Sequence, residues 1–556
     1  MLKKIPIILL FIASNLFAQN NKASFSYFEY KGNDACFEQK IDPKNQYRNP
    51  ILPGFYPDPS ICRRGDDYFL INSTFSYFPG IPVFHSKDLM HWKQIGNALD
   101  RPSQLKLDGL GVSSGVYAPA IEYNEKNQTF YIINTVVGDI GNFIVKSKDP
   151  FKGWSEPIKL PEVKGIDPSL FFDNDGKAYI VCSQASPAPK WSGHSVIWMH
   201  EFDVENDKAS AERHIVVDGG PDTIQHPRWL EGPHIYKENG YYYLMAAEGG
   251  TQSGHKEVIF RSELVKGPYI QGPNNPILTQ LGLPVERSYK VTNVGHADMV
   301  KTASGEWFAV FLGCRPYADE QFNTGRETFM LPVKWVDGFP VILEKGKTVA
   351  PVITKSNIAS KGDTQSGNFV WCDEFTKPSL DMKWLMLRTP REQWWKISKG
   401  QLELEVLPRN LSQPVNPAFI ARRQQHTNFE ASTSLRFTPK TETDLAGMAY
   451  FQNDKNYFVI GKSIKNNKQF ILIQSVIKGV VTLVAEKELA LSDYTKNVNF
   501  SIRVNEGVAN FYYSTTASKH AILLAPNIDV SNLSTKKAGG FVGSVIGMYA
   551  TSKIFF

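Results

Sequence analysis

Three carboxylates stand at the same position of a recurring sequence pattern. Asp58 begins Asp-Pro-Ser-Ile, Asp167 begins Asp-Pro-Ser-Leu, and Glu231 begins Glu-Gly-Pro-His-Ile. Because a residue before proline is held extended, Asp58 and Asp167 should have side chains of fixed direction. Carboxylates held in different protonation states can serve as the general acid and the general base of one reaction. Asp-Pro is also ordinary turn chemistry, but its recurrence, with Glu231 as a third acid, favours the catalytic interpretation.

The pattern occurs five times, and the two remaining copies begin at Ala118 and His296. Each copy contains a short strand, a polar turn with Gly or Asn, and an aromatic-aliphatic strand, which together predict a β-hairpin. Successive copies start 49 to 65 residues apart, so one unit is about four strands long. Radial repetition of four-stranded sheets predicts a five-bladed β-propeller over residues 49–345, in an all-β chain.

The propeller would bring these distant residues together. The first strand of each blade usually lines the central channel, so three carboxylates and His296 should meet at one mouth of it. Core packing alone would not select that set, because unpaired buried charges are costly. Glycoside hydrolysis needs a protonated carboxyl for the leaving oxygen and an ionised one for the attacking water. A third carboxylate near the acid would raise the pKa of that acid by like-charge repulsion.

The motifs around these residues resemble glycoside hydrolase family 43, in particular its β-xylosidases and α-L-arabinofuranosidases. The resemblance covers nearly all of the mature chain and is carried by Gly54-Phe55-Tyr56-Pro57-Asp58-Pro59-Ser60-Ile61, Ser73-Thr74-Phe75, Phe78-Pro79-Gly80, His85-Ser86-Lys87-Asp88-Leu89 and Glu231-Gly232-Pro233-His234. It implies a five-bladed propeller and inversion at the anomeric carbon. It also implies that Asp58 is the general base, Glu231 the general acid, and Asp167 the carboxylate that tunes and orients Glu231.

Three further positions match sugar-binding residues of that family. Arg326 matches an arginine that hydrogen-bonds the terminal sugar, and its fixed charge would also lower the pKa of a nearby base. The alternative for Arg326 is a surface ion pair with Glu327. Phe75 should wall the terminal-sugar pocket. Tyr117 stands where relatives often carry Trp, which leaves the exact sugar open.

His296 has more than one interpretation. It can be a structural histidine, a hydrogen-bonding group near the base, or a group that holds a channel-centred ion through water, as some relatives hold calcium there. No zinc site is expected from the five scattered cysteines, which have no CxxC pair and predict at most one or two disulfides. The sequence therefore predicts no required cofactor, with a structural Ca²⁺ in the channel left open.

The last third of the chain predicts a second domain. Residues 346–368 are polar and mixed and indicate a linker, and residues 369–556 contain at least six short alternating strands, which favour a β-sandwich. Phe375, Trp384 and Leu387-Arg388-Thr389-Pro390 resemble the concanavalin-like domain that follows the propeller in many family-43 β-xylosidases. Such a domain either donates a loop to the active-site rim or an oligomer contact, or serves as a packing and solubility partner.

Residues 1–18 have the pattern of a secretory signal peptide. Lys3 and Lys4 precede an apolar run over residues 5–12, and small residues lead to Ala18. Export to the periplasm or full secretion is expected, with residues 19–48 forming an N-terminal extension. No later stretch is long and apolar enough to span a membrane. The formal charge of +6 is spread along the chain without a basic block, which argues against nucleic-acid binding.

The sequence thus favours an exo-acting hydrolase that releases xylose or arabinose from oligosaccharides of plant cell-wall xylan or arabinoxylan. β-Xylosidase and α-L-arabinofuranosidase activities cannot be separated at this stage, and the oligomeric state stays open. One alternative is a retaining fructan hydrolase, a class that also uses a five-bladed propeller with three acids. Another is a carbohydrate-binding protein without catalysis, which would have no need of Asp58, Asp167 and Glu231 together.

Overall fold

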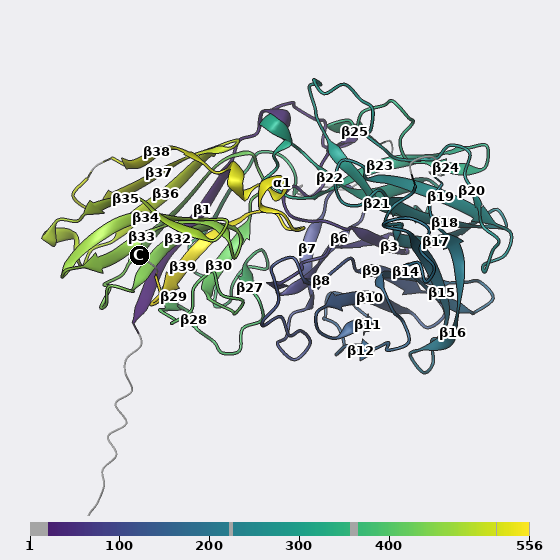
Figure 1. Ribbon diagram of the computed structural model, residues 1–556, viewed down its shortest axis with the longest axis horizontal. Helices are drawn as coiled ribbons and strands as arrows, with labels where there is room; N and C mark the ends of the chain where they lie inside the picture. Colours follow the sequence, from purple (N-terminus) through teal and green to yellow (C-terminus); the bar gives the residue numbers. More distant parts are fainter. Residues whose placement is uncertain (1–20, 222–225, 356–364, 519, 555–556) are drawn as a thin grey trace, which may run out of the picture.

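The computed structural model describes residues 21–221, 226–355, 365–518 and 520–554, which form two β-rich domains side by side (Figure 1). The predicted signal peptide lies outside the described residues. Helix is scarce: the described residues contain one α-helix, α1 (Thr535–Ala538). They also contain four short 3-10 helices, at Ala35–Phe37, Ala318–Glu320, Leu491–Asp493 and Ser531–Leu533. The prediction of an all-β chain is confirmed.

Five antiparallel sheets form the larger domain. In chain order they contain β3 (Ser60–Arg64), β4 (Asp67–Ile71), β6 (Gly80–Ser86) and β7 (Lys93–Leu99); β8 (Gly115–Val116), β9 (Ala120–Asn124), β10 (Thr129–Val137), β11 (Gly141–Ser147) and β12 (Ile158–Lys159); β13 (Ile166–Phe172), β14 (Ala178–Ala185), β15 (Ser195–Asp203) and β16 (Lys208–Asp218); β17 (Glu231–Glu238), β18 (Tyr241–Glu248), β19 (Lys256–Ser262) and β20 (Ile270–Gln271); β21 (Thr292–Lys301), β22 (Trp307–Cys314), β23 (Glu327–Val336) and β24 (Phe339–Val341).

These sheets are the predicted propeller blades. The strands β3, β9, β13, β17 and β21 each contact the next in turn, and β21 contacts β3, so the ring is closed. Neighbouring blades bury both faces of the middle strands, which explains their near-continuous apolar runs, such as Trp307–Cys314 in β22. Closure leaves few exposed sheet edges. The five-bladed propeller is confirmed.

Two eight-stranded sheets form the second domain and enclose one large apolar core. The first contains β28 (Trp395–Ser398), β29 (Gln401–Glu405), β1 (Lys22–Gly32), β26 (Val370–Asp373), β31 (Asn428–Arg436), β36 (Val498–Asn505), β37 (Val508–Thr515) and β38 (Ile522–Asp529). The second contains β35 (Val480–Glu488), β34 (Lys468–Ile477), β33 (Asn456–Lys465), β32 (Leu445–Asn453), β39 (Val545–Thr551), β30 (Ala418–Arg423), β27 (Leu385–Leu387) and β5 (Tyr77–Phe78). The predicted β-sandwich is confirmed.

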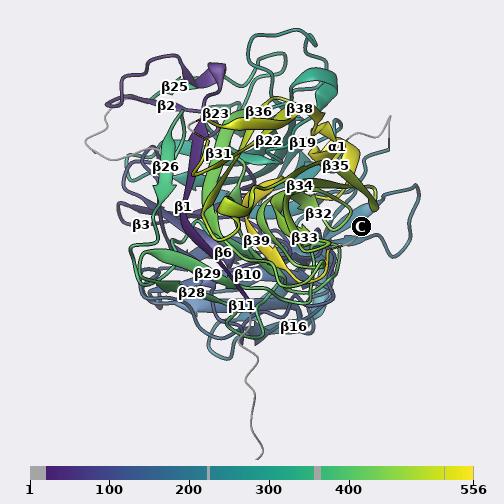
Figure 2. The same ribbon diagram turned by 90° about the vertical axis from the view of Figure 1, so that its left-hand side faces the viewer.

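The N-terminal segment belongs to this sandwich. β1 pairs with β26, β29 and β31 and lies among strands from the other end of the chain (Figure 2). Farther along, β2 (Gln46–Arg48) pairs with β25 (Val352–Thr354), which lies in the segment predicted as a linker. The expected N-terminal extension therefore contributes a central strand to the C-terminal domain. From residue 21 onward the chain first contributes a strand to the sandwich, then forms the propeller, and then returns to the sandwich.

The two domains share a continuous interface. β5 leaves the first blade and pairs with β27 of the sandwich. Phe55, Phe75 and Tyr77 of the propeller segment pack with sandwich residues such as Phe419 in one buried cluster. Gly54 lies so close to the sandwich backbone that an added Cβ would stand 2.6 Å from the Gln424 carbonyl oxygen. The sandwich is thus placed directly against the loop that precedes Asp58.

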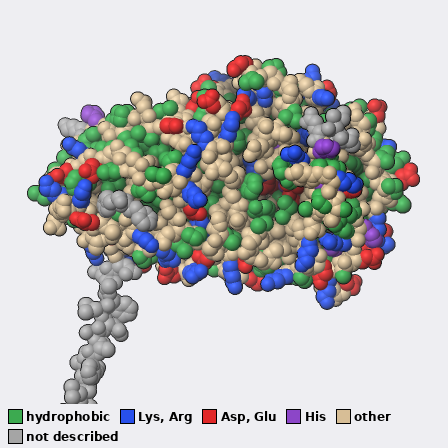
Figure 3. All heavy atoms as spheres, viewed as in Figure 1, with side chains coloured by type: hydrophobic (Ala, Val, Ile, Leu, Met, Phe, Trp, Pro, Cys, Tyr) green, Lys and Arg blue, Asp and Glu red, His purple; other side chains and the backbone are tan. Residues whose placement is uncertain are grey.

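Lys and Arg side chains are interspersed with Asp and Glu on the face in Figure 3 and do not gather into one basic patch. All five cysteines lie within the described residues and are free thiols. Among the described residues, no helix has the length and apolar character needed to cross a membrane.

Candidate active site

The functional side chains stand where the innermost strands begin. Asp58 lies just before β3, Asp167 is the second residue of β13, Glu231 opens β17, and His296 is the fifth of the ten residues of β21. Pairing with the next strand is interrupted by a bulge at Ile166/Ser169, at Glu231/His234 and around Gly295. Bulges re-aim side chains next to active sites, and here they turn the first residues of the blades toward the common axis.

The backbone at these positions differs from the prediction. Asp58, Asp167 and His296 have φ values of 50°, 52° and 51°, in the left-handed region and not the extended one. The expectation that proline would hold both Asp residues extended was therefore wrong, because tertiary contacts near the strand starts, such as the Asp58–Arg326 pair, outweigh the local preference. Such a backbone is costly for a residue other than glycine and is concentrated at functional sites.

Asp58 is an ionised carboxylate held by two donors. Arg326 Nη1 donates to Oδ1 at 2.8 Å, and the Ser73 hydroxyl donates to Oδ2 at 2.5 Å. Burial opposes ionisation, but the Arg326 charge, His296 and the Ser73 hydrogen bond together hold the pKa of Asp58 below its usual 3.8. Arg326 is itself only 5% exposed, so the surface ion pair considered for it is excluded.

The pKa values of Glu231 and Asp167 are raised, in contrast to that of Asp58. Burial and the negative charge of Asp58 raise the pKa of Glu231 to about 7, although Arg326 acts in the other direction. Burial, followed by the charges of Glu231 and Asp58, raises the pKa of Asp167 well above its usual value. Between these two pKa values the site therefore contains an ionised Asp58 beside a protonated Glu231, which is the division of roles that acid-base catalysis needs.

Two neutral histidines lie beside these carboxylates. Burial lowers the pKa of His296 to about 4 and that of His255 to about 3. The His296 ring packs against Gly232, where φ is 58° and an added Cβ would lie 2.8 Å from Nε2. Glycine after Glu231 is thus required by both the backbone and the close approach of this ring. His255 Nδ1 lies 3.1 Å from the Asn293 carbonyl oxygen, which orients its ring.

Three aromatic rings wall the site. The Phe75 and Tyr117 centroids are 5.3 Å apart, and the Phe541 ring stacks on Phe75 at 5.8 Å. Phe541 comes from the sandwich, in the segment between α1 and β39, and its carbonyl oxygen lies 3.5 Å from Arg326 Nη2. The Phe541 N–H donates to the Ser113 hydroxyl of the propeller at 2.9 Å. The sandwich therefore supplies part of the site wall.

A cavity of about 580 Å³ adjoins this arrangement. Its lining includes Arg326, His255 and Phe541, together with side chains from residues 280–293 and from the start of α1. Pockets of this size accommodate ligands of a few hundred daltons. The three carboxylates are not among its lining residues, so the cavity meets the site through Arg326, His255 and Phe541, and it is large enough for a short oligosaccharide there.

The structure brings together all seven residues singled out from the sequence. Charge interactions connect Tyr117 with Asp167, Arg326, Asp58 and Glu231, and Phe75 and His296 contact the same centre as described above. Sequence reasoning missed His255 and Phe541, and it quoted Ser73 only as part of a motif. No local pattern marks Phe541, since its partners Phe75, Tyr117 and Ser113 lie more than 400 residues away in the chain and Arg326 lies 215 residues away. Within the described ranges, no group of three or more His, Cys, Asp or Glu side chains is placed to hold a metal ion.

Comparison with known proteins gives the same assignment. The model of glycosyl hydrolases family 43 matches residues 47–340, and that of the beta xylosidase C-terminal concanavalin A-like domain matches residues 372–554. The chain belongs to glycosyl hydrolase family 43. This family-43 enzyme is a glycoside hydrolase, and its second domain is the concanavalin-like sandwich that the sequence predicted.

Individual relatives cover nearly the whole chain. A xylosidase/arabinosidase of Butyrivibrio fibrisolvens is 39% identical over 91% of this chain and 95% of its own. The non-reducing end alpha-L-arabinofuranosidase BoGH43B of Bacteroides ovatus is 36% identical over 91% of each chain. The crystal structure of a GH43_12 protein retrieved from a capybara gut metagenome is 39% identical, with a TM-score of 0.89 over 96% of this chain and all of that chain.

Proposed function

We propose that this glycoside hydrolase is an inverting, exo-acting β-xylosidase that releases xylose from the ends of xylan or arabinoxylan oligosaccharides. The observation that carries the proposal is the opposite protonation of two carboxylates in one site, with the pKa of Asp58 lowered and that of Glu231 raised to about 7. Hydrolysis of a glycosidic bond needs one carboxyl that can donate a proton and one that is ionised, and the inverting outcome is proposed from the resemblance to family 43.

In the proposed reaction Asp58 removes a proton from water as the water attacks the anomeric carbon. Glu231 donates its proton to the glycosidic oxygen, so the leaving sugar departs as a neutral alcohol. Asp167 and Glu231 resist being ionised together, because a second negative charge beside the first is unfavourable. Arg326 keeps Asp58 ionised and offers its remaining N–H groups to the hydroxyls of the terminal sugar.

Release of arabinose is a second candidate activity. Its support is that one relative is named a xylosidase/arabinosidase and another a non-reducing end alpha-L-arabinofuranosidase. The structural ground is Tyr117, which contacts Phe75 and Phe541 in the wall of the sugar site. The words "non-reducing end" in the name of the Bacteroides ovatus relative also support attack at chain ends.

A panel of pentosides tests both activities. We expect the wild-type enzyme to hydrolyse nitrophenyl β-D-xylopyranoside, nitrophenyl α-L-arabinofuranoside or both. Asp58→Ala should lower kcat by about 10²–10⁴-fold, because it removes the general base. Absence of turnover on every pentoside would refute the proposed substrate class, and full activity of Asp58→Ala would refute the proposed base.

Export and a channel ion are further proposals. Residues 1–18 support secretion to the periplasm or beyond the cell, which fits a large polysaccharide-derived substrate. His296 lies in the innermost strand of the last blade and is neutral, so its imidazole can accept a hydrogen bond from ion-bound water. Detection of calcium in purified enzyme by elemental analysis would support that role.

A further inference from the structure

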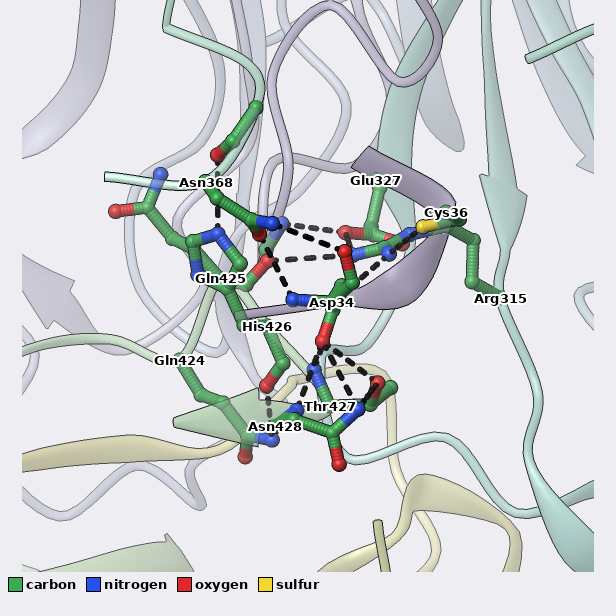
Figure 4. Close-up of polar contacts among 12 residues, drawn as sticks. Asp34, Cys36, Arg315, Glu327, Asn368, Gln424, Gln425, His426, Thr427 and Asn428 are labelled. Atoms are coloured by element: carbon green, nitrogen blue, oxygen red, sulfur yellow. Dashed lines mark hydrogen bonds and ion pairs between the residues drawn. The ribbon is translucent and has the colours of Figure 1, made fainter. Parts of the chain in front are cut away.

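A buried chain of charges joins the N-terminal segment, the last blade and the sandwich (Figure 4). It includes the residue that directly follows Arg326, the partner of Asp58. Its members are Asp34 from the N-terminal segment and Arg315 and Glu327 from the last blade. Their exposed fractions are 1%, 5% and 0%. None of the three lines the cavity beside Arg326, and Arg315 pairs with both carboxylates, so their charges are used within the protein.

Glu327 connects the two segments that carry the base and its arginine. It follows Arg326 directly, and its Oε1 accepts a hydrogen bond from the Gly54 N–H at 2.7 Å. Gly54 begins the loop that leads to Asp58. The Tyr56 N–H in that loop donates to the Arg326 carbonyl oxygen at 3.1 Å. The position of Glu327 therefore sets how the two segments lie against each other.

Arg315 holds Glu327 in that position. Its Nε and Nη2 donate to the two carboxylate oxygens of Glu327 at 2.7 and 3.0 Å, and its Nη1 donates to Asp34 Oδ2 at 2.8 Å. Nη2 also reaches the Gln425 carbonyl oxygen of the sandwich at 3.2 Å. The planar guanidinium is thus fixed on several sides, which restrains the carboxylate that it holds.

Asp34 fastens this arrangement to the sandwich. Its Oδ1 accepts hydrogen bonds from the Asn428 N–H and the Thr427 hydroxyl, both at 2.8 Å, and its Oδ2 accepts one from the Thr427 N–H at 3.2 Å. Its backbone exchanges two hydrogen bonds with the Asn368 side chain, at 2.8 and 3.1 Å. The Asn428 side chain also donates to Oδ1 at 3.5 Å, so six hydrogen bonds with Asn368, Thr427 and Asn428 determine where Asp34 meets Arg315.

We propose that Asp34 is a positioning residue for the catalytic base, because it holds Arg315 on Glu327 and thereby fixes Asp58 against Arg326. The inference rests on the assignment of Asp58 as the base. In this arrangement the N-terminal segment and the sandwich contribute to catalysis at a distance from the sugar. A loosened chain would lengthen the Asp58–Arg326 contact and misplace the base relative to water.

Asp34→Asn tests the proposal, because it keeps the shape of the side chain and removes its charge. We expect kcat to fall about tenfold with little change in KM, since small displacements of a catalytic group are costly. The acid limb of the kcat/KM pH profile should move to higher pH as Asp58 loses part of its pairing. The other charged or titratable groups facing Asp58 stay unchanged in this variant: His296, His255, Asp167, Glu231 and Tyr117.

Asp454→Asn is the matched control. Asp454 also accepts a hydrogen bond from a buried arginine at the domain interface, Arg388, at 2.8 Å, and Arg388 also donates to the Leu110 carbonyl oxygen of the propeller at 2.8 Å. We expect Asp454→Asn to lower the melting temperature without moving the acid limb. An equal shift of the acid limb in this control would overturn the proposal.

A milder variant covers the case in which Asp34→Asn does not fold. Thr427→Val removes one hydroxyl hydrogen bond to Asp34 and should shift kcat and the acid limb in the same direction by a smaller amount. Wild-type values of both quantities in a folded Asp34→Asn or Thr427→Val variant would refute the positioning role. Failure of the wild type to hydrolyse any pentoside would instead refute the proposed function.

Discussion

Replacement of Arg326 by glutamine should move the acid limb of the pH profile. The wild-type guanidinium lies 2.8 Å from Asp58 Oδ1 in a site where Asp58 is 4% exposed. An opposite charge at such a distance lowers a carboxyl pKa by about 1–3 units, or about 1.4–4 kcal/mol. Without the guanidinium, burial would raise the pKa of Asp58, because the largest opposing charge would be missing.

The sign follows from the role of the base. Asp58 works ionised, so activity is lost as pH falls through its pKa in the folded enzyme. In the wild type that pKa is below 3.8, and we expect the Arg326→Gln limb to lie about 1–3 pH units higher. The plateau rate should fall as well, because the terminal sugar loses a hydrogen-bonding partner.

The assay is kcat/KM for nitrophenyl β-D-xylopyranoside between about pH 3 and 8. Tyr117→Phe serves as the control, since it alters the same wall without removing a positive charge, and its acid limb should coincide with that of the wild type. An Arg326→Gln profile that is lower but not shifted would show that Arg326 acts only on the sugar. The proposal that Arg326 lowers the pKa of Asp58 would then be wrong.

Three other predictions concern the acid, the wall and the close packing around them. In the wild type kcat/KM should decline as pH rises through about 7, where Glu231 loses its proton. Glu231→Gln should lose far more activity on xylobiose than on a nitrophenyl xyloside, whose leaving group needs little protonation. Equal losses on the two substrates would contradict the assignment of Glu231 as the general acid. Phe541→Ala should raise KM by about tenfold, or 1.4 kcal/mol, with an unchanged melting curve for the propeller; an unchanged KM would remove the sandwich from the site. Gly232→Ala should lower kcat through contact with His296, and a variant with wild-type kcat would show that the ring can move freely.

The propeller was predictable because its signal is local. The residues that predict each hairpin lie within about 20 positions of one another. The recurrence of the pattern gives Asp58, Asp167, Glu231 and His296 the same position in their repeats. Closure of the ring then gathers these residues around one axis, since equivalent positions of the blades face the same axis. The three acids could therefore be assembled from sequence although they are far apart in the chain.

The parts that escaped prediction depend on distant partners. β1 looks like an isolated alternating strand until β31 and β29 pair with it from the other end of the chain. Phe541 follows two glycines in a segment without regular structure, and only domain packing brings it to Phe75. The left-handed backbone of Asp58 and Asp167 arises where tertiary contacts override the extended preference before proline.

The stereochemistry of the first product tests the central claim most directly. Proton NMR can follow nitrophenyl β-D-xylopyranoside during the first turnovers, before mutarotation mixes the anomers. With Asp58 activating water and Glu231 protonating the leaving oxygen, the first xylose should appear as the α anomer, with inverted configuration. Initial release of β-xylose would mean a covalent intermediate and would contradict the assigned roles of both carboxylates.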